Sequence, residues 1–154
     1  MISAAPRRFL RATPVTAGFD PGRAPARPAP TTTPIYLDRD GRTARVDVQL
    51  GSITKRMVID TGATGLSIPA WIAERLLWRR EAVEAQSAVM TLANGREELR
   101  QGVKLWSVTV GGRTLLDVYA TVAPHEAEPL LGFPVLNQAG RFTIDTVAGL
   151  LIMG

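Results

Sequence analysis

The stretch Val58-Ile59-Asp60-Thr61-Gly62-Ala63-Thr64 decides how this chain folds and which chemistry it offers. An apolar strand ends here in a carboxylate, and Gly62 permits a sharp turn and a close approach of substrate or of a second backbone. Thr61 can hydrogen-bond to the backbone or across to another chain, which would fix the turn. Because Asp and Gly are also ordinary turn residues, the tripeptide by itself leaves a purely structural role open.

Short alternations of apolar and polar residues flank this stretch on both sides, as expected of half-buried strands. Residues 38–41, Asp-Arg-Asp-Gly, supply a turn between the first two of them. Helix is expected only at residues 69–77, with proline in the first turn, and as a turn at 134–138. Many short strands with little helix predict an all-β fold, a closed β-barrel domain. Its strands are expected at residues 35–37, 44–50, 55–59, 105–110, 115–122, 141–144 and 150–153.

A hairpin is predicted over residues 88–103, with Asn94-Gly95 at its tip. Asparagine and glycine both tolerate positive φ, so this dipeptide favours a tight type I′ turn. The hairpin follows the Asp60 turn in the sequence and lies ahead of a third apolar element, Leu130-Leu131-Gly132.

The composition excludes several kinds of site. The chain of 154 residues has no cysteine, so disulfides, thiolate nucleophiles and cysteine metal sites are absent. The lone histidine, His125, cannot form a three-histidine zinc site within one chain, and its polar surroundings predict a surface loop. We therefore expect neither a metal nor another cofactor. Tryptophans 71, 78 and 106 are expected in the core or an interface.

The first 34 residues differ in composition from the rest of the chain. Five of the 18 basic residues and one of the 14 acidic residues lie there, leaving 13 of each after Pro34. Residues 1–34 are therefore predicted to be a Pro/Arg-rich disordered tail or linker, and residues 35–154 the folded domain. We expect no nucleic-acid partner. No signal peptide or membrane span is visible, so a soluble protein, in the cytoplasm unless the N-terminus is incomplete, is expected.

Three segments together resemble the retropepsin-like (retroviral-type) aspartic proteases of the single-domain bacterial kind. Residues 58–64 resemble the active-site signature of that family, residues 129–136 its second signature, and residues 91–95 lie where it has a flap hairpin. The resemblance covers residues 35–154 and departs at Gly65, where many relatives carry serine or another small residue. It implies an acid-protease barrel of the pepsin and retropepsin type.

The resemblance also implies a mechanism. Two Asp60 carboxylates, one from each subunit of a homodimer, would share a proton and activate a water that attacks a peptide bond of a polypeptide substrate. Thr61 would brace the two turns across the interface, Gly62 would contact substrate or lock the loop, and the hairpin around Asn94-Gly95 would close as a flap. The residues implied to bind substrate are Ala63, Thr64, Ala93, Asn94 and Gly95.

Alternatives to this interpretation remain. Asp145-Thr146 resembles a second catalytic acid, but Val147 replaces the glycine, so Asp145 is interpreted as a hairpin residue. The sequence Asp-Thr-Gly-Ala-Thr-Gly is also similar to phosphate loops of actin-like ATPases, which need a longer chain and a second loop. A non-catalytic dimerisation or peptide-binding module of the same fold would keep the barrel without turnover.

Overall fold

The computed structural model describes residue 22 and residues 28–154. The predicted tail therefore lies largely outside the described part, and its disorder stays a prediction. The first strand begins at Thr31, ahead of the boundary expected at residue 35, because residues 31–34 pair with the last strand of the chain. That pairing joins the two ends of the domain, so local sequence does not reveal it.

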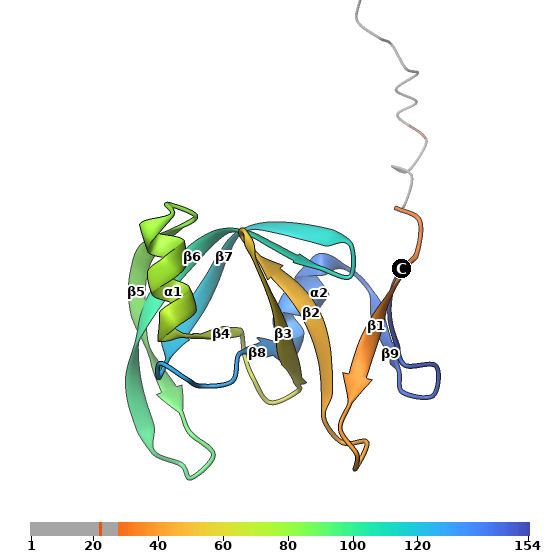
Figure 1. Cartoon of the computed structure of the whole chain (residues 1–154), viewed down its shortest axis with the longest axis horizontal. Helices are drawn as coiled ribbons and strands as arrows, with labels where there is room; N and C mark the ends of the chain where they lie inside the picture. The colour runs from red at the N-terminus through yellow and green to blue at the C-terminus, as the bar shows by residue number, and fades with distance from the viewer. Residues whose placement is uncertain (1–21, 23–27) are drawn as a thin grey trace, which may run out of the picture.

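Ten strands and two short helices make up the described residues (Figure 1). The strands are β1 Thr31–Leu37, β2 Ala44–Leu50, β3 Ile53–Asp60, β4 Leu66–Pro69, β5 Ala82–Thr91, β6 Glu97–Val110, β7 Arg113–Ala123, β8 Leu130–Gly132, β9 Phe142–Asp145 and β10 Leu150–Met153. The helices are α1 Ala70–Trp78 and α2 Phe133–Ala139. The all-β prediction with two short helices is confirmed.

Pairing between distant strands closes the sheet into a barrel. The strand order is β5-β6-β7-β4-β8-β3-β2-β1-β10-β9, and β2 also pairs with β6. Strands β6, β7, β4, β8, β3 and β2 therefore form a ring, which removes most of the free edges of the sheet. Alternate side chains of these strands point into the ring and form the core, among them Val46, Met57, Leu66, Leu105 and Leu131.

The two helices cover the barrel where the sequence predicted helix. Helix α1 follows Pro69, which lies at its N-cap, and buries Ile72, Ala73 and Leu76 against the strands. Helix α2 has proline in its first turn and buries Val135 and Leu136. Proline is tolerated at these positions because the first N–H groups of a helix have no partner within the helix. Among the described residues, no helix is long and apolar enough to cross a membrane.

The hairpin of β5 and β6 is longer than predicted, and its turn differs from the type I′ turn expected. At the tip the N–H of Leu92 donates to the carbonyl of Arg96, and the N–H of Gly95 donates to the carbonyl of Leu92. Gly95 has φ of 80°, whereas Asn94 does not have positive φ. A type I′ turn needs positive φ at both residues, so the prediction is wrong. The loop takes the three-residue form, with glycine alone in the left-handed region.

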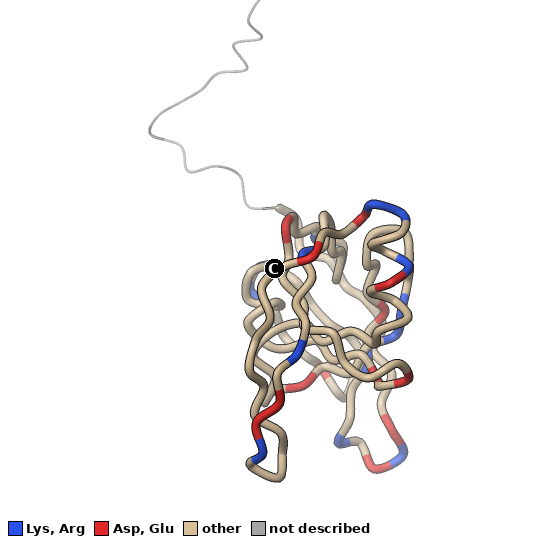
Figure 2. Tube along the Cα trace, turned by 90° about the vertical axis from the view of Figure 1, so that its left-hand side faces the viewer, with Lys and Arg blue, Asp and Glu red and all other residues tan. Residues whose placement is uncertain are grey.

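The hairpins β1–β2 and β5–β6 project from the same end of the barrel, with charged residues of both signs along them (Figures 1 and 2). The turn between β3 and β4, which carries Asp60, falls between them in Figure 1. This end of the barrel therefore holds the residues for which the sequence predicted chemistry.

Candidate active site

Asp60 is the last residue of β3, and the turn that follows holds its carboxylate. The N–H of Gly62 donates to Asp60 Oδ1 at 2.9 Å, and the N–H of Ala63 donates to the Asp60 carbonyl at 3.3 Å. The side chain is half-buried, whereas Thr61 and Gly62 are exposed. A carboxylate that accepts a backbone N–H two residues later is fixed in rotation and keeps its second oxygen available.

The segment Leu130-Leu131-Gly132 supports this turn from behind. Strand β8 runs parallel to β3 and sets Gly132 opposite Asp60. The N–H of Gly132 donates to the carbonyl of Gly65 at 2.9 Å. A Cβ added to Gly132 would lie 2.5 Å from the carbonyl oxygen of Ala63 and 2.7 Å from that of Gly65. Only glycine lets the two backbones approach so closely, which explains why the two sequence signatures belong together.

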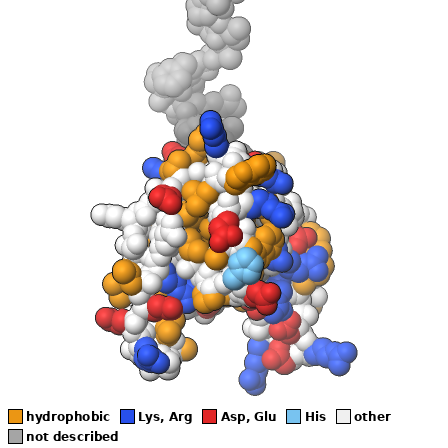
Figure 3. Space-filling view, turned by 60° about the vertical axis from the view of Figure 1, so that its left-hand side comes forward, with side chains coloured by type: hydrophobic (Ala, Val, Ile, Leu, Met, Phe, Trp, Pro, Cys, Tyr) orange, Lys and Arg blue, Asp and Glu red, His pale blue; other side chains and the backbone are white. Residues whose placement is uncertain are grey.

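A cleft of about 840 Å³ opens over the Asp60 turn. One side of it is formed by residues 60 and 62–67, and the other by residues 88–93 at the end of β5 and the start of the hairpin loop. In the space-filling view the surface is hollowed between the two projecting hairpins (Figure 3). The cleft thus has the Asp60 carboxylate on one side and a hairpin on the other.

The residues predicted from the sequence fall into two groups. Lining the cleft are Asp60, Gly62, Ala63, Thr64 and Ala93. Thr61 does not line it, and neither do Asn94 and Gly95 at the tip of the hairpin, which are exposed. The structure therefore brings the Asp60 turn together with the near end of the hairpin and leaves the tip outside the cleft.

Four polar residues of the cleft were missed by the sequence analysis. Ser67 and Thr121 lie in its buried part, each 6 % exposed, and Arg100 and Tyr119 line it from β6 and β7. None of the four belongs to the segments that carry the family resemblance. Knowledge of the strand pairing, Ser67 and Gly102 with Thr121, Ala88 with Arg100, and Lys104 with Tyr119, would have been needed to find them.

The electrostatics of the cleft rest on two opposite charges. Asp60 is the acidic residue and Arg100 the basic residue among those lining it. Within the described part of the chain, no group of three or more histidine, cysteine, aspartate or glutamate side chains could hold a metal ion. Asp60 has no second carboxylate beside it among the cleft residues, so a two-carboxylate mechanism needs another copy of the turn.

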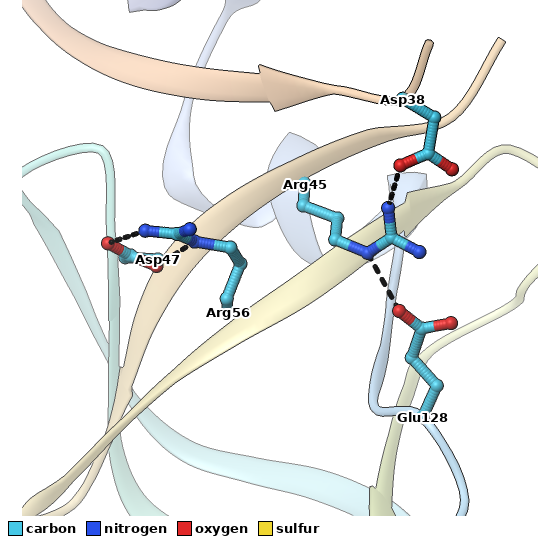
Figure 4. A network of polar contacts seen from close by, with 5 residues as sticks. All are labelled: Asp38, Arg45, Asp47, Arg56 and Glu128. Atoms are coloured by element: carbon cyan, nitrogen blue, oxygen red, sulfur yellow. Dashed lines mark hydrogen bonds and ion pairs between the residues drawn. The ribbon is translucent and has the colours of Figure 1, made fainter. Parts of the chain in front are cut away.

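A second hollow, of about 450 Å³, lies between β2, β3, the start of α1 and residues 125–129. Arg45 binds both Asp38 and Glu128 there, and Arg56 binds Asp47 at 3.0 Å (Figure 4). The hydrogen bond that Arg45 donates to Glu128 raises the pKa of Arg45, and the hydrogen bond that Arg56 donates to Asp47 raises the pKa of Arg56. Each guanidinium therefore stays protonated until the pH is strongly alkaline.

The ion pair between Arg45 and Glu128 ties the loop of residues 124–129 to β2. His125 is exposed in this loop, as predicted, and is the pale-blue side chain of Figure 3. The arginines of the hollow already have carboxylate partners, so we assign it a structural role.

Comparisons with known proteins identify the family and the fold of this chain. A family model described as "gag-polyprotein putative aspartyl protease" matches residues 46–138. The fold is similar to the crystal structure of a retropepsin-like aspartic protease from Rickettsia conorii, with a TM-score of 0.58 and 21% sequence identity. The match covers 80% of this chain and 89% of that one. No curated protein matches the chain.

Proposed function

This chain belongs to the family of gag-polyprotein aspartyl proteases and has the retropepsin-like fold. We therefore propose that it is an aspartic endopeptidase. The observation that carries the proposal is the position of Asp60. Its carboxylate ends a core strand, accepts the N–H of Gly62 at 2.9 Å and lines a cleft of about 840 Å³. A cleft of that size accommodates several residues of an extended peptide beside the carboxylate.

In the proposed reaction, two Asp60 side chains share one proton, because two carboxylates in close contact do not both ionise. The ionised member takes a proton from a water, and the water attacks the peptide carbonyl while the protonated member donates to the carbonyl oxygen. Gly62 holds the carboxylate through its N–H. Thr61 is exposed, and its side chain has no partner in the described residues. It faces outward to brace the turn of the second copy.

A homodimer supplies the second carboxylate. One chain has one Asp-Thr-Gly turn, and a twofold axis through the mouth of the cleft would place two such turns face to face. Strand β9 ends the sheet, so its outer backbone edge is unpaired within residues 28–154 and offers hydrogen bonds to a second copy. These two features support the dimer.

The β5–β6 hairpin is proposed to close over the peptide. Its tip, Asn94 and Gly95, lies outside the cleft here, whereas Ala93 lines it. An inward movement of the tip would bring Asn94 and Gly95 onto the substrate, opposite Ala63 and Thr64, and would exclude water. The substrate would lie extended and hydrogen-bond to backbone groups on both sides.

The test is hydrolysis of an unstructured polypeptide by Asp60→Asn and by the parent protein. Loss of the carboxylate should lower kcat/KM at least about a thousand-fold, because it removes both the base and the acid of the reaction. Asp40→Asn is the matched control, since Asp40 lies in the β1–β2 turn outside the cleft and the charge change is the same. Equal cleavage by Asp60→Asn and the parent would exclude the mechanism.

A further inference from the structure

The cleft contains a positive charge that the proposed reaction does not use. Arg100, on β6, lines it, and its side chain is 16% exposed. Its Nε and Nη2 donate to one oxygen of Glu98 at 3.2 and 3.1 Å. A guanidinium has five N–H donors, so these two bonds leave donors free for a ligand.

The ion pair between Arg100 and Glu98 adds little to the stability of the β5–β6 hairpin. The two residues lie two positions apart on one strand, and the Glu98 side chain is 46% exposed and absent from the cleft lining. An ion pair whose carboxylate is this exposed contributes little to the free energy of unfolding. Glu98 is instead a competing carboxylate, which partly neutralises the guanidinium and can give way to a ligand carboxylate.

The wall next to Arg100 is also polar. Gly102 and Arg100 lie on the same face of β6, and Gly102 pairs with Thr121 of β7. Thr121 is 6% exposed, and its Oγ1 has no hydrogen-bond partner among the described residues. A buried hydroxyl without a partner is unfavourable for folding, which points to a ligand group that reaches this part of the cleft.

We propose that Arg100 makes this cleft select peptides with a glutamate or aspartate side chain close to the bond that is cut. The substrate carboxylate accepts hydrogen bonds from the free guanidinium N–H groups, with Thr121 beside it as a further polar neighbour. The positive charge also offsets the repulsion between an acidic side chain and the ionised member of the Asp60 pair. The inference deepens the proposed function and rests on it.

The hydrolysis test uses pairs of peptides that differ only in glutamate against glutamine at one position near a cleavage site. Those sites are mapped first by mass spectrometry of a digested peptide library. The parent should show kcat/KM about ten-fold higher for the glutamate peptide, a ratio that Arg100→Ala brings to about one. Arg100→Glu should instead prefer lysine over glutamine. Arg75→Ala is the control, because Arg75 is exposed on α1, outside the cleft, and the charge change is equal.

A binding test separates this inference from the peptidase proposal. Fluorescent peptide pools with a central glutamate or a central glutamine are titrated against Asp60→Asn protein with Arg100 intact or replaced by alanine. Tighter binding of the glutamate pool, about ten-fold and lost with Arg100→Ala, supports the acidic subsite even if no peptide is ever cut. Equal affinity for both pools, an unchanged ratio in Arg100→Ala, or no binding of either pool would overturn it.

Glu98→Gln gives an outcome that a merely structural role for Arg100 does not predict. Removal of the competing carboxylate should increase the glutamate preference in both tests, because the guanidinium charge is then less neutralised. A decrease of the preference to about one would contradict the inference.

Discussion

Two aspartates of this chain show the same local chemistry and differ in what surrounds them. Asp60 Oδ1 accepts the N–H of Gly62, and Asp145 Oδ1 accepts the N–H groups of Val147 and Ala148 at 3.0 and 2.8 Å. Both are aspartates that cap the turn after a strand. Asp145 stabilises the turn between β9 and β10, as the sequence indicated, whereas Asp60 lies in the cleft. A local motif therefore does not by itself distinguish a turn residue from a candidate catalytic acid.

Thr121 gives a prediction about stability at the scale of one residue. Thr121→Val keeps the shape of the side chain and removes a buried hydroxyl that lacks a partner, so the free energy of unfolding should rise by about 1 kcal/mol. Thr31→Val is the matched comparison, because the Thr31 hydroxyl donates to the carbonyl of Gly111 at 2.6 Å. That change should lower the free energy of unfolding by about 1 kcal/mol. Urea unfolding measures both, and a loss of stability in Thr121→Val would show that its hydroxyl has a partner.

Among the elements, the base of the β5–β6 hairpin determines where the proposed flap can move. The register of β5 against β6 shifts between Ala85 and Ala88, and Gly102 of β6 pairs with Ala85 at this irregularity. The hydroxyl of Tyr119 donates to the carbonyl of Gln86 at 2.6 Å, which ties the irregular segment to β7. The hairpin is therefore anchored at its base, while residues 91 and 93–99 beyond it are exposed.

Gly102→Ala should break this anchor. An added Cβ would lie 2.1 Å from the carbonyl oxygen of Gln86 and 2.4 Å from the Tyr119 hydroxyl, so the strands must separate. We expect a loss of about 3 kcal/mol in the free energy of unfolding, at the upper end for overpacking because one clash is with backbone. Gly65→Ala is the control, since nothing lies within 4 Å of its added Cβ and its φ is not positive. Equal stability of the two variants would contradict this role of Gly102.

At the scale of the whole molecule, folding and the proposed activity differ in whether they need a second copy of the chain. The ring of six strands from β6 to β2 satisfies most backbone groups within one chain, so the fold needs no partner for its core. The proposed reaction does need one, because a single chain provides one Asp60. Assembly is therefore predicted to control activity and not folding.

Dilution tests this prediction. The cleavage rate per chain should fall as the protein is diluted below the dissociation constant of the dimer, because a monomer has half a site. Two copies joined in one polypeptide are the control, since a linker keeps the effective concentration of the second copy high. The joined protein should keep its rate per site on dilution. A constant rate per chain for the unlinked protein down to about nanomolar concentrations, where weak dimers are dissociated, would contradict a reversible dimer.

The sequence by itself determined the strand-rich class of the fold and the Asp60 turn, because both depend on local patterns. Alternation of apolar and polar residues predicted the strands, and glycine after a carboxylate predicted the turn at residues 60–62. It also predicted where the hairpin lies, although not its turn type, because the φ of Asn94 depends on how β5 and β6 meet.

Only the tertiary structure decided what surrounds Asp60. Arg100, Tyr119 and Thr121 reach the cleft through the pairing of β5 with β6, β6 with β7, and β7 with β4. A shift of one residue in any of these registers would turn their side chains to the opposite face, and local sequence does not fix a register between distant strands. The start of β1 at Thr31 has the same origin, since its partner β10 lies at the other end of the chain. The sequence therefore identified the candidate carboxylate, and the long-range pairing of strands set the charge and polarity of its cleft.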